Sequence, residues 1–252
     1  MDHTSLVSHL AEPMQNVGQA FYFTPETQAI GEAIGLPDTT LFYGLGRGGI
    51  MGDVDAGTVA DAFYWFKPDV VEMLWNAGTA AVSASEAAAA HLAAAHAFGR
   101  AAFADTPELH AFVAAAAKVA DAVDGFPAPL FSGYRAVPLP EDAPAAAMQL
   151  AVEMRELRGD AFVAAARELD LAPAIGHYIT SPDNFALFGY SEQDVPLITE
   201  EDRARRHACE IRCEELLHPA FEVLTDEEIL AFAAGAELMH AAAGPIPDLP
   251  TA

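Results

Sequence analysis

Apolar residues recur every three or four positions along most of this chain, which is the spacing of one helix face. Val59, Phe63 and Phe66, for example, fall on the same side of a helix that we expect to begin at Asp55. Only Val195–Ile198 and parts of Leu41–Met51 could form extended chain. The pattern therefore predicts an all-α fold with at most one short hairpin.

Capping residues divide the helical pattern into segments. Thr199 with Asp202 and Thr225 with Glu228 have the spacing of capping boxes, in which two side chains satisfy free N–H groups at a helix start. Gly244 is a stop signal. Signals of this kind predict helices over residues 24–35, 55–66, 68–78, 83–103, 106–125, 142–159, 160–169, from 199 onward, and 225–244.

The chain contains a faint internal duplication. The segment beginning at Leu41 can be aligned with the segment beginning at Leu130, and in each an arginine follows (Arg47 and Arg135), then an acidic loop and an apolar helix. We therefore expect two similar helical halves, residues 1–104 and 105–252. The alternative is chance similarity within an alanine-rich chain.

The net charge of the chain argues against two classes of binding partner. The chain has 252 residues, 37 of them acidic and 12 basic, and its formal net charge is −25. Nucleic acids and anionic membranes are polyanions, so this charge argues against both. The sequence also has no basic and apolar leader, no run of about 20 apolar residues, and too few cysteines for a disulfide framework. We expect a cytoplasmic protein that does not bind a membrane.

Three stretches resemble a known family. They read YFTPETQAIGEAIGL, YGLGRGGIMGDVDAGTVADAFYWFKPDVVEMLW and LAVEMRELRGDAFVAAARELDL. Their order and spacing are similar to those of an actinobacterial group of largely uncharacterised proteins labelled helix-turn-helix or MarR-like. The resemblance implies two winged-helix-like halves packed together, and it implies no particular activity.

Two departures from that family pattern bear on function. Two histidines of the pattern, which could ligate a metal or haem, are replaced here by Leu157 and Phe162. The segment from Gly189 to Thr199 is short, so we expect the second recognition helix and its wing to be reduced or absent. Because a helix-turn-helix protein reads DNA with that helix, the resemblance describes the fold more than the function.

Aromatic residues are concentrated in the first third of the chain, and Arg47 lies among them. An apolar pocket with a few polar anchors is the usual form of a small-molecule site. Within the second half, Arg155 lies inside a predicted helix and needs a carboxylate or a ligand as its partner. We predict that a small, largely apolar or aromatic molecule is bound by Tyr43, Arg47, Phe63, Trp65, Trp75, Arg135, Arg155 and Arg158. The alternative is an aromatic core without a ligand.

Three further clusters favour simpler interpretations. The arginines between Asp202 and Glu214 have acidic neighbours at helical spacing, so we expect the ion pairs Glu201–Arg205, Asp202–Arg206 and Arg206–Glu210 rather than a basic patch. Cys209 and Cys213 could begin a zinc site, but no second cluster completes it, so we expect buried thiols and no metal. The glycines of residues 44–49 lack the strand and lysine of a phosphate loop, which favours a turn.

Three functions remain compatible with these patterns. The first is a ligand-binding protein that does not bind DNA. The second is an enzyme of bacterial specialised metabolism in which Tyr43 or His177 acts as an acid–base group. The third is a MarR-like transcription regulator. We also expect a homodimer through the apolar helix of Ile229–Ala243. The sequence does not identify a cofactor.

Overall fold

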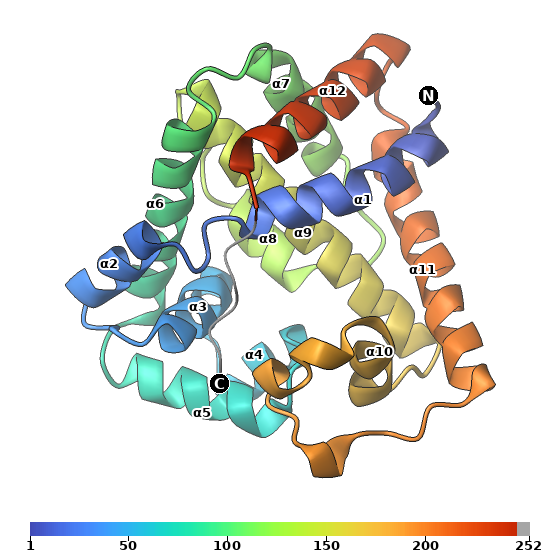
Figure 1. The fold of residues 1–252 in the computed structure, drawn as a ribbon. Coiled ribbons are helices and arrows are strands. Elements are labelled where there is room, and N and C mark those ends of the chain that lie inside the picture. The colour runs from blue at the N-terminus through green and yellow to red at the C-terminus, as the bar shows by residue number, and fades with distance from the viewer. Residues whose placement is uncertain (246–252) are drawn as a thin grey trace.

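The computed structural model describes residues 1–245, which form twelve α-helices and four 3-10 turns (Figure 1). No β-strand occurs among these residues, so the expected all-α fold is confirmed, and the one short hairpin that the sequence allowed does not form within them. Val195–Ile198 has no regular structure, and most of Leu41–Met51 is helical. No β-hairpin wing therefore occurs within residues 1–245.

The longest helix, α9 (Ala143–Glu168), runs through the middle of the molecule (Figure 1). Its alanine-rich first half is buried on nearly every side, which lets several helices approach it closely. The helices packed directly on it are α1 (His3–Gln19), α6 (Ala84–Ala102), α7 (Leu109–Asp121), α8 (Pro129–Arg135) and α11 (Glu200–Phe221). None of the helices within residues 1–245 is long and apolar enough to cross a membrane.

A second, smaller core lies among α2 (Pro25–Ala33), α3 (Thr39–Gly48), α4 (Ala56–Ala62) and α5 (Pro68–Thr79). Phe42, Leu45, Val71 and Trp75 are buried there. Helix α6 joins the two cores, since it packs on α2 and α3 as well as on α9. The division into residues 1–104 and 105–252 stays a prediction.

The last helices complete the molecule on two sides. α10 (Pro173–Thr180) and the following turns η2 (Pro182–Asn184), η3 (Ala186–Phe188) and η4 (Glu192–Asp194) connect α9 to α11. α12 (Asp226–Ala243) packs across α1 and α7. It buries Ile229, Phe232 and Met239 within its own chain and leaves Leu230 and Leu238 exposed. The homodimer through this helix stays a prediction.

Both predicted capping boxes, at Thr199 and at Thr225, are present. Several other boundaries differ from the prediction. Residues 142–169 form one helix instead of two, because Gly159 costs a helix only about 1 kcal/mol and the buried residues around it outweigh that. The glycines of residues 44–48 likewise belong to α3 instead of a turn.

The aromatic segment after α4 is a turn and not the predicted continuation of the helix. α4 ends at Ala62, and Phe63 leaves the helical conformation. Lys67 is extended, as expected for a residue before Pro68, which begins α5. The predicted start at Thr106 is also wrong, because α7 begins after Glu108. The sequence prediction did not include α1, α8 or α10.

Candidate functional site

A cleft of about 430 Å³ opens where α3, α9, α10 and α11 meet the Phe63–Phe66 turn. A hollow of about 390 Å³ adjoins it, shares Tyr43, Arg155 and His177 with it, and extends toward Tyr22. We name the two together the central cleft. Six residues singled out from the sequence line it, namely Tyr43, Arg47, Trp65, Arg155, Arg158 and His177.

A buried ion-pair network forms one wall of the central cleft. Arg47 lies one helical turn after Tyr43 on α3, so the two side chains share a face, and Arg47 Nη1 donates to Tyr43 Oη at 3.1 Å. Arg47 also donates through Nε and Nη2 to the two oxygens of Glu156 on α9, at 2.9 and 2.7 Å. Arg155 Nη1 donates to Glu156 Oε1 at 2.6 Å. Two guanidinium groups therefore share one carboxylate.

The shared carboxylate is held in its charged form. Burial by itself would raise the pKa of Glu156, but Arg47 and Arg155, together with the hydroxyl of Tyr22, lower it to about 2. The pair of arginines keeps an excess of one positive charge beside the cleft. One donor of this network is unused, because Arg155 Nε is buried and has no hydrogen-bond partner within residues 1–245.

A second charged group lies where α9 faces α11. Arg158 donates to one oxygen of Glu210, and Arg206 Nη1 donates to the other at 2.8 Å. Arg206 also donates through Nε to Thr180 Oγ1 at 3.0 Å, and its guanidinium lies 4.3 Å from the ring centre of Phe162. This wall again holds two arginines and one glutamate.

Aromatic side chains form the remaining walls. Trp65 contacts Phe162 with ring centres 5.4 Å apart. α10 approaches Trp65 through Gly176, where an added Cβ would lie 2.7 Å from the indole. His177 lies 3.9 Å from the ring centre of Phe188, and burial lowers the pKa of this histidine. Its Nε2 is buried and has no hydrogen-bond partner in the described part of the chain. The cleft is thus lined by arginines, aromatic rings and the imidazole of His177.

Three residues predicted to bind the ligand do not line the central cleft. Phe63 lies behind Arg47, with its ring centre 4.4 Å from the guanidinium carbon. Trp75 belongs to the smaller core, where it approaches Gly48. Arg135 projects from α8 and pairs with Asp121.

Several residues that line the central cleft were not singled out as ligand-binding from the sequence, namely Tyr22, Phe162, Arg206 and Glu210. Glu156, which binds Arg47 and Arg155 without lining the cleft itself, was not singled out either. The predicted pairs Arg206–Glu210 and Glu201–Arg205 are confirmed. Helical spacing alone could not predict that Arg206 and Glu210 line a cleft. The predicted pair Asp202–Arg206 is wrong, because Asp202 caps α11 and faces Arg205.

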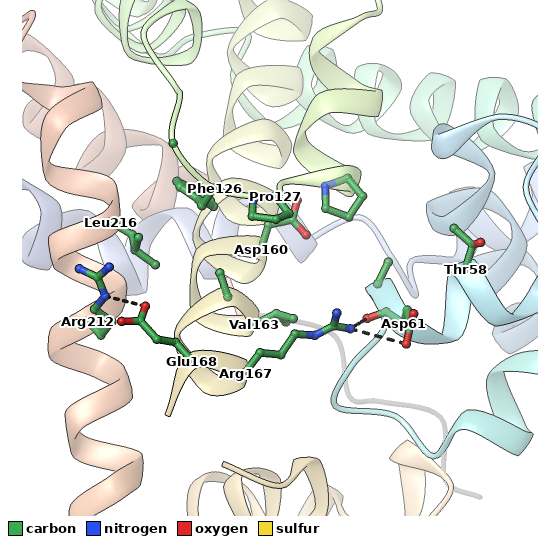
Figure 2. A pocket seen from close by; sticks show the side chains of 14 residues that line it. Thr58, Asp61, Phe126, Pro127, Asp160, Val163, Arg167, Glu168, Arg212 and Leu216 are labelled. Atoms are coloured by element: carbon green, nitrogen blue, oxygen red, sulfur yellow. Dashed lines mark hydrogen bonds and ion pairs between the residues drawn. The ribbon is translucent and has the colours of Figure 1, made fainter. Parts of the chain in front are cut away.

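A second cavity, of about 450 Å³, lies against another face of α9 (Figure 2). Its charged side chains are already paired within it, since Arg167 contacts Asp61 and Arg212 contacts Glu168. Asp160 also lines it, and this carboxylate accepts a hydrogen bond from the backbone N–H of Phe131 at 2.9 Å. The second cavity contains none of the residues predicted to bind a ligand.

The cysteines are buried, as predicted. The Cys209 thiol lies 3.8 Å from the carbonyl oxygen of Ala165, and the Cys213 thiol lies 3.7 Å from that of Arg158. Among residues 1–245 no three histidine, cysteine, aspartate or glutamate side chains are grouped so that they could hold a metal ion.

Comparison with known proteins places the chain in a family. A family model described as a helix-turn-helix family matches residues 7–194, which is most of the chain, so the chain belongs to this family. The matched part includes Arg47, Arg155 and His177, whereas Arg206 and Glu210 lie beyond it. No curated protein and no solved structure matches the chain.

Proposed function

We propose that this member of a helix-turn-helix family binds a small, largely apolar or aromatic molecule in the central cleft. One observation carries the proposal: residues distant in sequence, including Arg47, Trp65, Arg155 and His177, meet at one cleft and leave buried polar atoms without partners among residues 1–245. Apolar walls with a few converging polar groups are typical of small-molecule sites. Native proteins seldom leave such groups unpaired, which points to a missing partner.

The distribution of charge favours ligand binding without DNA binding. Every lysine and arginine side chain of the protein lies within 4.0 Å of an acidic side chain. Residues 25–79, which form the helices of the smaller core, contain only Arg47 and Lys67 as basic residues against eight acidic ones. Phosphate contacts need unpaired basic groups on the surface, because they supply most of the affinity for DNA.

The family match favours transcription regulation as a second candidate function. A gel-shift assay with the DNA upstream of its own gene, at about 50 mM salt where phosphate contacts are strongest, tests this candidate. A shift that disappears at higher salt would support regulation, and no shift would remove it.

The proposed function is tested with two variants of the same helix. Gly159→Phe fills the central cleft, because Gly159 lines the cleft and no atom of residues 1–245 lies within 4 Å of a Cβ built at this position. Ala164→Phe adds a phenyl ring to α9 at the second cavity instead. The probes are indole, 4-phenylbutanamide and 4-phenylbutanoate, and binding is measured by isothermal titration calorimetry.

We expect at least one probe to bind the wild-type protein and the Ala164→Phe variant with similar affinity. The Gly159→Phe variant should bind it at least tenfold more weakly, a loss of about 1.4 kcal/mol. Equal binding by all three proteins would contradict the proposed site. No binding to the wild type at about 1 mM probe would contradict the proposed function.

A further inference from the structure

We infer that the ligand carries a carboxylate, which binds among Arg155, Arg158 and Arg206 by taking the place of the Glu210 side chain. This inference rests on the proposed function of the central cleft and names the chemical class of its ligand. It follows from the balance of charge at the cleft, from the geometry of Glu210, and from the free donor of Arg155.

The balance of charge is positive at the central cleft although the protein is strongly acidic. Arg47 and Arg155 share Glu156, and Arg158 and Arg206 share Glu210. Each group of three keeps one positive charge in excess, whereas the whole chain has a net charge of −25. Charges in a partly dry cleft interact more strongly than charges in open water. The cleft therefore attracts an anionic group that the rest of the surface would repel.

Glu210 already shows how a carboxylate fits between two of these arginines. One of its oxygens accepts from Arg158 and the other from Arg206. Its side chain is 32% exposed, whereas that of Glu156 is 1% exposed. Glu156 is thus a fixed part of the wall, while Glu210 lies at the border with solvent on the outer helix α11 and can swing away. A ligand carboxylate can replace it without leaving any guanidinium unpaired.

Arg155 supplies a hydrogen-bond donor that Glu210 does not use and that a ligand carboxylate could bind. Arg155 and Arg158 are three residues apart on α9, so both lie on the helix face that lines the cleft. The Nε of Arg155 has no partner within residues 1–245, and its flat guanidinium is suited to a planar carboxylate. The adjoining hollow continues past Tyr22, Phe23 and Leu187. These side chains would contact the apolar body of the ligand.

The experiment compares two acids with their uncharged amides, which have nearly the same shape. The probes are 4-phenylbutanoate and octanoate, each paired with its primary amide. They are titrated by calorimetry into the wild type and into the variants Glu210→Gln and Arg155→Lys. Glu215→Gln is the matched control, since it removes one carboxylate from the same helix but from an exposed pair with Arg212.

We expect the wild type to bind an acid about tenfold more tightly than its amide, as charge-assisted hydrogen bonds require. Glu210→Gln removes the competing charge, so it should raise the affinity for the acid about threefold or more and leave amide binding unchanged. Arg155→Lys keeps the charge but removes Nε, so it should weaken binding of the acid. Glu215→Gln should change neither affinity.

The two proposals fail in different ways. If acid and amide bind equally well, or if Glu210→Gln weakens acid binding, the inference about the carboxylate is overturned and the proposed function stands. If neither acid nor amide binds the wild type or Glu210→Gln at about 1 mM, the inference about the carboxylate is overturned, and if indole also fails to bind the wild type, the proposed function is overturned with it. Circular dichroism of each variant shows whether it is folded, and Arg155→Lys provides a second test that does not depend on Glu210.

Discussion

Arg47 and Glu156 are 109 residues apart in the sequence and form a buried ion pair with two hydrogen bonds across α3 and α9. This pair joins the smaller core to the central helix of the larger one. It also fixes the wall of the central cleft, because Arg155 binds the same carboxylate. Stability and the proposed binding function therefore depend on the same group.

Replacing Glu156 tests the importance of this pair for stability. Glu156→Gln leaves two buried guanidinium groups without their counter-ion, and losing one partner of a buried pair costs about 3–5 kcal/mol. Urea denaturation should show a loss of that size in the free energy of unfolding. Glu215→Gln, which breaks an exposed pair, should cost less than about 1 kcal/mol. Equal losses in the two variants would contradict the network.

Glu156 also predicts a dependence of stability on pH. Its pKa in the folded protein is about 2, because Arg47 and Arg155 outweigh the effect of burial, whereas its ordinary value is 4.5. The stability it contributes is complete above pH 4.5 and is lost as the pH falls toward 2. Between these values the free energy of unfolding of Glu156→Gln should fall less steeply than that of the wild type. Parallel curves from urea denaturation would exclude this role.

His91, which is enclosed by aromatic side chains, predicts a second dependence of stability on pH. It is fully buried against Phe21, Tyr22 and Phe42, and neither ring nitrogen has a hydrogen-bond partner within residues 1–245. Burial lowers its pKa to about 3, compared with an ordinary value of 6.5. Below pH 6.5 only the unfolded chain takes up the proton, so stability is lost as the pH falls toward 3.

His91→Leu removes both the titration and the unpaired nitrogens. The variant should be at least as stable as the wild type at pH 7 and should lose less stability between pH 7 and pH 5. Urea denaturation at these two pH values measures both effects. His207→Leu, at an exposed position of α11, is the control for the substitution itself. A steeper loss in His91→Leu would be the opposite of this prediction.

Asp160 predicts a pH effect of the opposite sign. Its carboxylate binds the N–H of Phe131 in the first turn of α8, and burial raises its pKa from 3.8 to about 7. The folded protein keeps a proton that the unfolded chain releases, so this group weakens stability as the pH rises from 3.8 to 7. Asp160→Asn should therefore gain stability over the wild type at pH 8 and match it near pH 4.

The control for that variant is Asp142→Asn. Asp142 caps α9, and the hydrogen bond from Arg100 lowers the pKa of its carboxyl. Its contribution is present above its ordinary pKa, so this substitution should destabilise the protein at pH 8. Thermal unfolding of both variants across pH measures the difference. If both substitutions changed the stability at pH 8 in the same direction, the effect proposed for the carboxyl group of Asp160 would be wrong.

Two glycines of the central cleft predict opposite effects of an added methyl group. A Cβ at Gly176 would lie 2.7 Å from Trp65, so Gly176→Ala must displace the indole. A Cβ at Gly159 has no atom of the described residues within 4 Å, so Gly159→Ala should stabilise α9 by about 0.5–1 kcal/mol. Thermal unfolding gives the stability, and tryptophan fluorescence should shift only in Gly176→Ala. A fluorescence shift in Gly159→Ala alone would contradict the described wall.

Local signals in the sequence predicted the parts of the fold that depend on neighbouring residues. The capping boxes at Thr199 and Thr225 are examples, because every atom they need lies within three residues. The end of α4 was missed because the Phe63–Phe66 turn depends on tertiary packing, with Phe63 in one core and Trp65 against α10. The prediction that Gly159 ends a helix is wrong, since burial of α9 outweighs the cost of one glycine inside it.

The candidate site was predicted only in part, because residue type can be read locally whereas the contacts between distant residues cannot. Residue type identified Arg47 and Trp65 as candidates because an arginine among aromatic residues is typical of a small-molecule site, and Arg155 because an arginine inside a helix needs a partner. The partner of Arg47 is Glu156, 109 residues away, and no spacing rule connects them. Trp75 and Arg135 have equally suitable side chains, but the chain places them in the smaller core and on α8.

The emission of Trp65, which lines the central cleft, reports directly on whether a small molecule binds there. The protein has two tryptophans, so Trp75→Phe leaves Trp65 as the only one. Titration of this variant with 4-phenylbutanoate should change the Trp65 emission until it saturates, with the affinity that calorimetry gives, and Gly159→Phe should abolish the change. Binding that calorimetry detects while Trp65 emission stays constant, and that Ala164→Phe removes, would place the ligand in the second cavity and contradict the account.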